Sequence, residues 1–479
     1  MNASVTPVLW TADAIARATG GALTRGFEAS GVSIDSRTVK SGDLFIAIKG
    51  PNSDGHDYVT SALDRGAAGA IVHDDCPGAG DDAPLVRVAD TFAALNDLGR
   101  AARARTHARV GAITGSVGKT GTKEALAHVL APAVSVHASR GSLNNHWGVP
   151  LSLARMSPEA AVAIFEIGMN HIGEITPLAE MVRPHVALIT TVEGAHKGNF
   201  SSLDEIADAK AEIFIGMDPG GTAVLNRDNR FFDRLSRAAR QMGVETVLSF
   251  GLDASADIHL IDAALDGSGT SVTASVLGRT LRYRLGLPGR HWAINSLAVL
   301  GMVHALGADE ETAALHFESF QAPKGRGAIH TIAVDGGTVT LIDESYNASP
   351  VSMNAAIGIL ALAASETDGR AIAVLGDMLE LGADEAADHV ALKEVLDGRE
   401  VDQVFTAGPL MKNLWNVLAD GMKGAHAPDA GALAAMVTAS LRPGDVVMVK
   451  GSAGIHMGRV VDAILAINGE AHTRAANGN

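Results

Sequence analysis

The sequence is poor in several features that mark whole classes of protein. Its single cysteine, Cys76, cannot form an internal disulfide or a cysteine-based zinc site, so we expect a free thiol in a reducing cytoplasm. No apolar run approaches the roughly 18 residues of a transmembrane helix, and the N-terminus lacks the basic and apolar regions of a signal peptide. We therefore expect no membrane insertion.

Positive charge is also scarce. The chain has 38 Lys and Arg residues against 54 Asp and Glu residues, a formal net charge of −16, and we find no run of basic residues. Nucleic-acid binding usually needs a basic patch, so we do not expect that class of partner. An anionic nucleotide would instead have to meet a few local cations and backbone N–H groups.

Aromatic residues make up only 4% of the chain, so the cores must be built from Ala, Val, Leu and Ile. A length of 479 residues suggests about three domains. Alternating strand and helix patterns predict an α/β protein. We expect a smaller N-terminal α/β domain (1–108), a central P-loop-type domain with a parallel sheet (109–322) and a C-terminal doubly wound, Rossmann-like domain (323–479). Residues 256–288 differ, because they are typical of antiparallel strands joined by glycine turns.

The segment AITGSVGKTGTKEA (112–125) follows a predicted strand and opens a helix predicted over 119–130. In this context glycines let phosphates approach the backbone, and the helix N-terminus offers N–H groups and a positive dipole. Lys119 would supply charge to the β- and γ-phosphates, and Thr120 could ligate Mg²⁺. The segment predicts a nucleotide-binding loop.

The spacing of this loop is unusual. The common P-loop places a glycine five residues before the position of Gly118, where this chain has Ile113, and the nearest glycine is Gly115. The alternative is an ordinary glycine-rich turn between a strand and a helix.

Glu166 lies near the end of the predicted strand 160–168. Parallel sheets bind their ligands at the carboxyl ends of strands, so this carboxylate could hold a metal on the phosphates. The alternative is a solvated acid at a strand end.

Ser202 and Glu205 have the spacing of a capping box and predict the start of a helix. Its apolar stripe contains Leu203, Ile206, Ala207, Lys210, Ala211 and Phe214. A lysine facing the core is costly unless it is paired or chemically altered, although Lys210 could also snorkel at the edge of the stripe. His196, just upstream, could be a core or surface histidine, or a ligand of metal or phosphate.

The segment LIDESYNASP (341–350) ends a predicted strand with Asp343, Tyr346 and Asn347. An acid at this place can bind ribose hydroxyls and a tyrosine can stack on a base. The alternative is a polar turn before the next helix.

Taken together, these segments resemble the Mur ligases, ATP-dependent amide-forming enzymes of peptidoglycan synthesis. The resemblance covers nearly the whole chain and rests on DSRTVKSGDLFIAIKG with DGH (35–56), GSVGKTGTKE (115–124), GSLNNHWGVP (141–150), EIGMNHIGEI (166–175), AHKGNF (195–200), GRHWAIN (289–295), KGRG (324–327), DESYNASPVSM (343–353) and LGDMLELG (375–382). Several of these motifs are most similar to those of the members that join D-alanyl-D-alanine to UDP-N-acetylmuramoyl-tripeptide. A DNPR-type motif, usual in sister enzymes that add diaminopimelate or lysine, is not found in this sequence.

The resemblance implies a mechanism and a set of site residues. ATP would phosphorylate the terminal carboxylate of the UDP-linked substrate, and the incoming amine would then displace phosphate. The implied catalytic residues are Lys119, Asn144, Asn145, His196 and Lys210. The implied Mg²⁺ ligands are Thr120, Glu166, His196 and, if its amine is carbamylated, Lys210.

Nucleotide and substrate contacts are implied in the same way. ATP would be bound by Gly115, Ser116, Gly118, Lys119, Thr120, Gly121, Asn295, Arg326, Asp343, Tyr346 and Asn347. Of these, Asn295 would lie near adenine, Arg326 near the phosphates and Asp343 near the ribose. The N-terminal domain would bind the UDP-sugar through Ser36, Arg37, Gly55 and His56, and the C-terminal domain would receive the incoming dipeptide.

Three positions depart from the family pattern. Gly121 stands where relatives usually have Thr or Ser, Trp292 replaces a common Asn, and Ala453 replaces a common Arg. The last departure removes an expected contact to the carboxylate of the incoming dipeptide.

Other functions stay open at this stage. They are a sister ligase that adds another amino acid or glutamylates folate, a kinase, and a non-catalytic nucleotide-gated module. For the ligase itself we expect a monomer.

Overall fold

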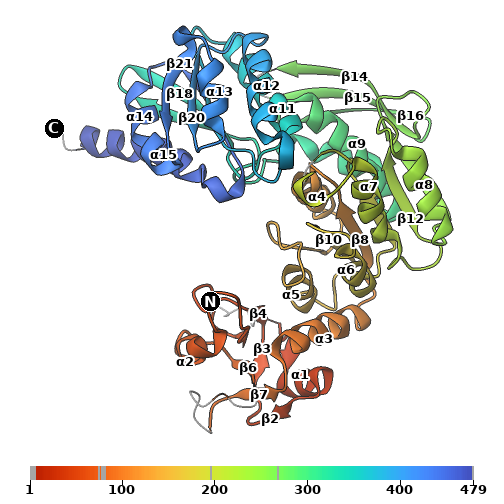
Figure 1. The fold of residues 1–479 in the computed structure, drawn as a ribbon. Helices are drawn as coiled ribbons and strands as arrows, with labels where there is room; N and C mark the ends of the chain where they lie inside the picture. Colours follow the sequence, from red (N-terminus) through yellow and green to blue (C-terminus); the bar gives the residue numbers. More distant parts are fainter. Residues whose placement is uncertain (1–6, 74–75, 77–81, 195–196, 267–268, 477–479) are drawn as a thin grey trace.

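The structure is a computed structural model, and it describes residues 7–73, 76, 82–194, 197–266 and 269–476. Three α/β bodies follow one another along the chain (Figure 1). The N-terminal body lies at the lower end of the view, the central body at the right, and the C-terminal body at the upper left. Each of the three larger sheets lies inside one of the predicted domains. The domain boundaries themselves stay predictions.

The N-terminal body is built on a small sheet. Its strand order is β2 (Ala22–Leu23), β7 (Leu85–Val88), β6 (Gly69–His73), β5 (Asp43–Ile46) and β4 (Gly31–Ser33). Its helices are α1 (Ala12–Thr19), α2 (Val59–Asp64) and α3 (Thr91–Ala104), and a small separate sheet pairs β1 (Trp10–Thr11) with β3 (Glu28–Ala29). Helix α3 leads into the central body and packs on α5 (Gly148–Ala154).

The central body holds one sheet that is partly parallel and partly antiparallel. Its order is β16 (Arg279–Leu285), β15 (Gly269–Val276), β14 (Ile258–Asp266), β13 (Thr246–Gly251), β12 (Thr222–Asn226), β11 (Val186–Ile189), β8 (Arg109–Thr114), β10 (Val162–Glu166) and β9 (Val136–Ala138). The pairs from β9 to β14 are parallel, and those from β14 to β16 are antiparallel. The predicted antiparallel addition over 256–288 is confirmed.

Helices cover both faces of this sheet. One core packs α4 (Lys119–Leu130) and α9 (Arg290–Ala305) on one face, with α10 (Glu310–Leu315) beside them. The other core packs α5, α6 (Ile175–Val182), α7 (Leu203–Ala211) and α8 (Phe232–Gln241) on the opposite face. The loop after β8 therefore opens at the carboxyl edge of the sheet, where α/β proteins bind ligands.

The C-terminal body is doubly wound, as predicted. Its order is β17 (Ala328–Val334), β18 (Gly337–Glu344), β22 (Val446–Lys450), β19 (Ala371–Gly376), β20 (Gln403–Ala407) and β21 (Lys423–Ala427). One face carries α11 (Pro350–Ser365), α12 (Glu385–Asp397) and α13 (Met411–Val417), and the other carries α14 (Ala430–Ser440) and α15 (Gly458–Ala476).

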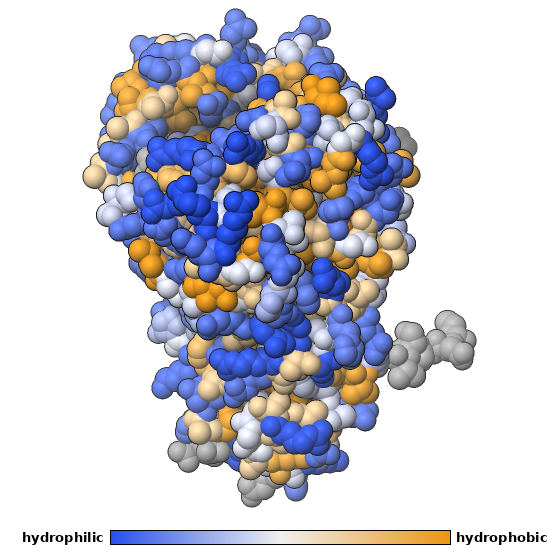
Figure 2. Space-filling view, turned by 90° about the vertical axis from the view of Figure 1, so that its right-hand side faces the viewer, coloured by the Kyte–Doolittle hydropathy of each residue, from blue (hydrophilic) through white to orange (hydrophobic). Residues whose placement is uncertain are grey.

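The face in Figure 2 mixes hydrophilic and hydrophobic residues over its whole length. Among the described residues, no helix combines the length and the apolar character needed to cross a bilayer.

A half-buried histidine makes the stability of the central body depend on pH. His137 in β9 donates from Nε2 to the carbonyl of Ser152 at 2.9 Å, and burial lowers the pKa of His137 to about 4. The folded protein binds this proton less readily than the unfolded chain, whose histidine has a pKa of about 6.5. Stability is therefore lost as pH falls from about 6.5 towards 4.

We expect His137→Asn to remove this loss. Between pH 7 and pH 5 the wild type should lose about 1–2 kcal/mol of unfolding free energy more than the variant. Urea unfolding at both pH values measures the difference. Equal losses in the two proteins would contradict the assignment.

Candidate active site

The phosphate loop spans residues 115–118, between β8 and α4. Gly115 has φ of 149° and Gly118 has φ of 85°, and a Cβ at Gly115 would lie 1.9 Å from Oγ1 of Thr190. Thr190 in turn donates to the carbonyl of Val117 at 2.6 Å. Only glycine fits this close approach, so the backbone requires a glycine at position 115 of this loop. Helix α4 begins at Lys119, as predicted, and Lys119 Nζ donates to the carbonyl of Gly115 at 2.6 Å.

A buried carboxylate lies beside the loop. Glu166 ends β10, next to β8 in the sheet, and is 1% exposed. One of its oxygens accepts from Thr120 Oγ1 at 2.7 Å, and the other accepts from Asn144 Nδ2 at 2.7 Å. The alternative of a solvated acid is therefore wrong. Residues from three separate motifs meet at this one carboxylate.

Two lysines of the site, the partly exposed Lys119 and the buried Lys210, have lowered pKa values. Burial lowers the pKa of Lys119, an effect that Glu166 opposes and Arg326 adds to. Lys210 is 2% exposed, and burial, followed by repulsion from Lys119, holds the pKa of Lys210 well below its ordinary value. The snorkelling alternative is wrong, because the amine lies inside the protein. Burial of this kind disfavours the charged form of the amine.

Helix α7 presents Lys210 from the predicted stripe. Its N-cap Ser202 accepts from the backbone N–H of Glu205 at 3.2 Å, as predicted. The carboxylate of Glu205 accepts instead from the backbone N–H of Ser201 at 2.7 Å, one residue before the cap. The helix starts as expected, with the reciprocal bond displaced by one residue.

One contact joins the central and C-terminal bodies at the loop. Arg326 donates to Ser142 Oγ at 3.1 Å, and Ser142 Oγ lies 3.4 Å from Thr120 Oγ1. The guanidinium of Arg326 also lies over the ring of Tyr346, 4.0 Å from its centre. Arg326 therefore contacts both Ser142 and Tyr346 at this junction, and the assignment of Arg326 and Tyr346 to ATP stays a prediction.

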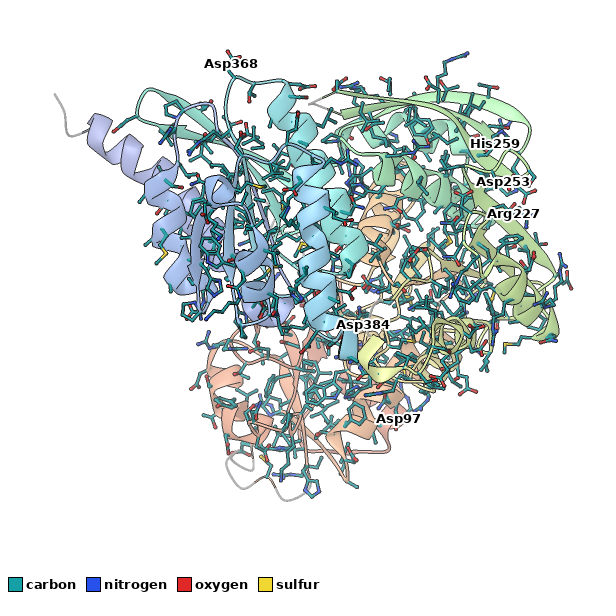
Figure 3. All side chains as sticks on the ribbon, turned by 45° about the horizontal axis from the view of Figure 1, so that its top comes forward. Asp97, Arg227, Asp253, His259, Asp368 and Asp384 are labelled. Carbon is teal, nitrogen blue, oxygen red and sulfur yellow. The ribbon has the colours of Figure 1, made fainter. Side chains whose placement is uncertain are left out.

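A second contact joins the same two bodies. The backbone N–H of Gly198 donates to the carbonyl of Glu380 at 3.0 Å. Figure 3 labels Asp384, which directly precedes α12 in this region. His196, two residues before Gly198, lies outside the described residues, so its predicted role stays a prediction.

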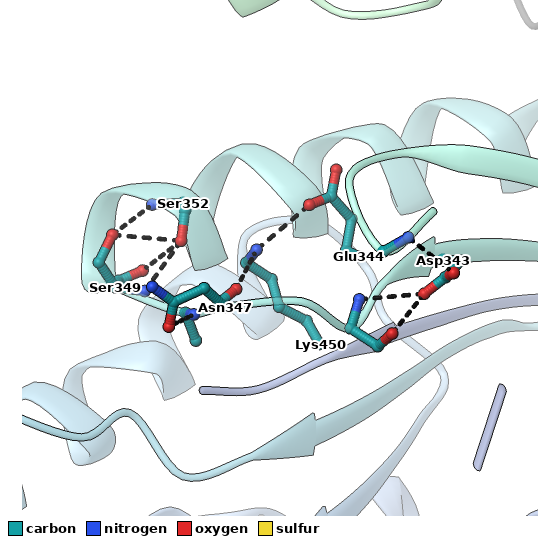
Figure 4. Close-up of polar contacts among 9 residues, drawn as sticks. Asp343, Glu344, Asn347, Ser349, Ser352 and Lys450 are labelled. Carbon is teal, nitrogen blue, oxygen red and sulfur yellow. Dashed lines mark hydrogen bonds and ion pairs between the residues drawn. The ribbon is translucent and has the colours of Figure 1, made fainter. Parts of the chain in front are cut away.

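The end of β18 forms a polar network (Figure 4). Asp343 is fully buried and accepts from the backbone N–H of Gly325 and from Ser345, at 2.6 to 3.1 Å. Lys450 donates to Glu344 at 3.2 Å and to the carbonyl of Asn347 at 2.9 Å. Asp343 thus holds the interdomain turn in this structure, and its assignment to ribose stays a prediction.

Asn295 and Trp292 come from the first turns of α9. A Cβ at Gly118 would lie 3.4 Å from Oδ1 of Asn295, so the amide borders the phosphate loop. A Cβ at Gly121 would lie 2.8 Å from Cη2 of Trp292. Gly121 and Trp292, two separate departures in the sequence, therefore face each other in space.

The side chains of two other predicted residues, Asn145 and Ser116, form hydrogen bonds with the protein backbone. Asn145 Oδ1 accepts from the backbone N–H groups of Trp147 and Gly148 and so caps α5. Ser116 Oγ exchanges two 2.9 Å bonds with the backbone of Glu193.

Among the residues predicted to bind the UDP-sugar, Gly55 and His56 lie in a short 3₁₀ helix (Gly55–Tyr58) of the N-terminal body, and Ser36 and Arg37 lie in a turn of the same body. His56 contacts Asp54 through Nδ1 at 2.6 Å and accepts from the backbone N–H of His73 through Nε2 at 2.9 Å. A Cβ at Gly55 would lie 2.7 Å from the backbone nitrogen of Ile48, so this position requires glycine. Ser36 and Arg37 follow β4, where the exposed Arg37 pairs with Asp35 at 2.8 Å. Figure 1 shows that this body lies apart from the phosphate loop.

The oxygen atoms at Glu166 suit a hard cation. Among the described residues, no group of three or more His, Cys, Asp or Glu could hold a metal ion. Thr120 Oγ1 and Glu166 nevertheless lie within 2.7 Å of each other, and Mg²⁺ is commonly bound by one or two protein oxygens together with substrate phosphates. The donor set fits Mg²⁺ in this mode.

Sequence reasoning missed three polar residues of the site, Ser142, Lys123 and Lys450. Ser142 lies in a motif that was recognised for its two asparagines. Lys123 follows Lys119 by one helical turn, and this spacing was the available signal. Lys450 ends β22, next to the end of β18, and required knowledge of the strand order.

Family models match three consecutive parts of the chain. They are the Mur ligase family catalytic domain over residues 28–103, the Mur ligase middle domain over 113–303, and the Mur ligase glutamate ligase domain over 326–453. The chain is 32% identical to the UDP-N-acetylmuramoyl-tripeptide–D-alanyl-D-alanine ligase of Rickettsia prowazekii, over 95% of this chain and 99% of that protein.

Solved structures agree with these matches. The structure of MurF from Acinetobacter baumannii is similar with a TM-score of 0.80 and 29% identity, over 95% of this chain and 99% of that one. MurF from Thermotoga maritima in complex with ADP is similar with a TM-score of 0.75 and 26% identity, over 92% and 98% of the two chains. With this likeness along nearly its whole length, the chain belongs to the Mur ligase family.

Proposed function

We propose that this protein uses ATP to join D-alanyl-D-alanine to UDP-N-acetylmuramoyl-tripeptide, giving the UDP-muramoyl-pentapeptide, ADP and phosphate. The observation that carries the proposal is the likeness over nearly the whole chain to ligases named for this reaction. The convergence of Thr120, Asn144 and Glu166 beside the phosphate loop supports it. The reaction uses ATP and nucleotide-linked precursors, so we place it in the cytoplasm and expect a monomer to carry it out.

The first step moves the γ-phosphoryl group of ATP to the terminal carboxylate of the tripeptide. A carboxylate oxygen bonds to phosphorus, the bond to the β-phosphate oxygen breaks, and ADP leaves. Phosphoryl transfer needs positioning and charge neutralisation more than covalent help. The N–H groups at the start of α4 bind phosphate oxygens, while Lys119 and Arg326 supply positive charge.

In the second step the amine of D-alanyl-D-alanine attacks the acyl phosphate. The new C–N bond forms, the C–O bond to phosphate breaks, and the amine loses a proton. Asn347 and Tyr346 lie at the end of β18, beside the joint between the two bodies. We assign them to the side of the site that meets the nucleotide and the incoming amine.

Thr120 and Glu166 would hold Mg²⁺, with His196 and a carbamylated Lys210 completing the site. The ion would supply charge neutralisation at the phosphates. The amine of Lys210 is suited to carbamylation because burial disfavours its charged form, and the uncharged amine is the form that attacks CO₂.

Phosphate release across a panel of acceptor pairs tests the function. We expect release only when UDP-muramoyl-tripeptide, D-alanyl-D-alanine and ATP are all present, with tripeptides ending in diaminopimelate and in lysine tested in parallel. Release with another amino acid instead would assign the protein to a sister ligase. Release without any amine would indicate a kinase, and nucleotide binding without release would indicate a binding module.

A further inference from the structure

A second lysine of the phosphate-loop helix is buried and has no place in the mechanism above. Lys123 lies one turn after Lys119 in α4 and has no exposed surface. Its Nζ donates to the carbonyls of Ser139 and Gly141 at 2.5 and 2.6 Å, and lies 2.8 Å from Glu124. A buried cation is tolerated only when it is paired and hydrogen-bonded, so this geometry marks a specific tether.

The tethered segment, residues 139–144, carries side chains of the site. Ser139 Oγ accepts from the backbone N–H of Glu166 at 3.2 Å. Asn144 donates to the Glu166 carboxylate, and its carbonyl accepts from the backbone N–H of Gly168 at 2.8 Å. Ser142 meets both Thr120 and Arg326. The segment therefore contacts α4, β10 and the C-terminal body at once.

Lys123 fixes this segment at its two carbonyls, next to these three contacts. Without the cation, the buried carbonyl of Ser139 and the part-buried carbonyl of Gly141 would lose their shared donor, and the segment would be free to move. Displacement by about 1 Å at a reacting site can cost about a hundredfold in rate.

We propose that Lys123 is a positioning residue for phosphoryl transfer. It ties residues 139–144 to the phosphate-loop helix, so that Asn144 and Ser142 stay in place beside Glu166 and Thr120. The proposal rests on the proposed ligase function for its kinetic consequences, while the tether itself can be measured without turnover.

The test compares Lys123→Met with the wild type and with Lys393→Met, a control at a lysine of α12 that pairs with Asp397 one turn away. We expect kcat of phosphate release to fall about a hundredfold in Lys123→Met. Affinity for ADP should change less than threefold, because Lys119 and the loop N–H groups remain. Lys393→Met should match the wild type.

A double variant distinguishes a positioning role of Lys123 from a role in stability alone. If Lys123 acts through Asn144, the double variant Lys123→Met with Asn144→Ala should be no less active than the less active of the two single variants. Additive losses, or a wild-type kcat in Lys123→Met, would overturn the proposal. Should Lys123→Met fail to fold, Lys123→Gln keeps donors for the carbonyls without the charge, and we expect about a tenfold loss from it.

Amide hydrogen exchange separates this proposal from the proposed function. In Lys123→Met, exchange at residues 141–145 should rise at least tenfold, whereas exchange in β8 stays as in the wild type. Unchanged protection at 141–145 would refute the tether even if the wild type turned over no acceptor pair. Absence of wild-type turnover with every pair would refute only the ligase function.

Discussion

Replacement of Lys210 by methionine is expected to lower kcat by about 10²- to 10³-fold without lowering the thermal unfolding temperature. The side chain is 2% exposed, and burial holds the pKa of Lys210 well below its ordinary value. A buried amine stabilises a fold poorly, and methionine has a similar length without the polar group. Activity and stability should therefore separate, which is the mark of a residue kept for chemistry.

The carbamate hypothesis sharpens this expectation. The uncharged form of Nζ would attack the carbon of CO₂, an N–C bond would form and one proton would leave, so a buried amine would become an anion. Carbamylation would thereby place a negative charge near the ammonium group of Lys119. A protein equilibrated with ¹³C-labelled bicarbonate should show one carbamate carbon signal, which Lys210→Met abolishes.

Lys210→Arg provides the control, because arginine keeps a cation but forms no carbamate under these conditions. We expect it to be as inactive as Lys210→Met and less stable, since it leaves a permanent charge beside Lys119. An active Lys210→Met variant would exclude a role for this side chain in the reaction. An active Lys210→Arg variant would exclude the carbamate and leave a role for positive charge.

Lys210 also shows what local patterns can predict. Helical periodicity placed it on the buried stripe of α7, and the structure confirms its burial. The bounds of α4 and the antiparallel addition over 258–285 followed in the same way from glycine positions and alternation. Each of these features is decided by the local sequence.

Contacts between distant segments could not be predicted in this way. That the carboxylate of Asp343 accepts from the backbone N–H of Gly325 required knowledge of how the interdomain turn folds back, and the assignment of Asp343 to the ribose stays a prediction. Lys123 reaches the carbonyls of Ser139 and Gly141 only because β9 lies beside β10 in the sheet. The strand order, which the local pattern leaves open, decides which motifs share a site.

Gly121 and Trp292 illustrate this coupling, and Gly121→Thr is expected to raise the KM for ATP roughly tenfold and to destabilise the protein by about 1–3 kcal/mol. The threonine Cβ would lie 2.8 Å from Cη2 and 3.3 Å from Cζ3 of the indole. The ring has little room to yield, because it is 7% exposed and packs edge-on against Phe320 at 5.6 Å. Strain at Trp292 would pass along α9 to Asn295, which borders the phosphate loop.

Gly358→Thr is the matched control for the substitution itself. Gly358 also lies inside a helix, α11, but the nearest atoms to its added Cβ belong to the side chain of Arg399, at 3.8 Å. Thermal unfolding and ATP kinetics of this variant should stay close to those of the wild type. A similar loss in both variants would trace the effect to helix propensity and not to the indole.

The double variant Gly121→Thr with Trp292→Asn decides whether the two positions act as a pair. Trp292→Asn alone should destabilise the protein by about 3 kcal/mol, because it empties a packed site. If the indole occupies the space of the missing side chain, the threonine should fill part of the cavity that Trp292→Asn leaves. The double variant should then lose about 0.5–3 kcal/mol less unfolding free energy than the two single variants lose together. Strict additivity would mean that the effect of each substitution on the unfolding free energy does not depend on the residue at the other position. A positive coupling would mean that a hydroxyl at position 121 of α4 is tolerated better once the tryptophan has been removed.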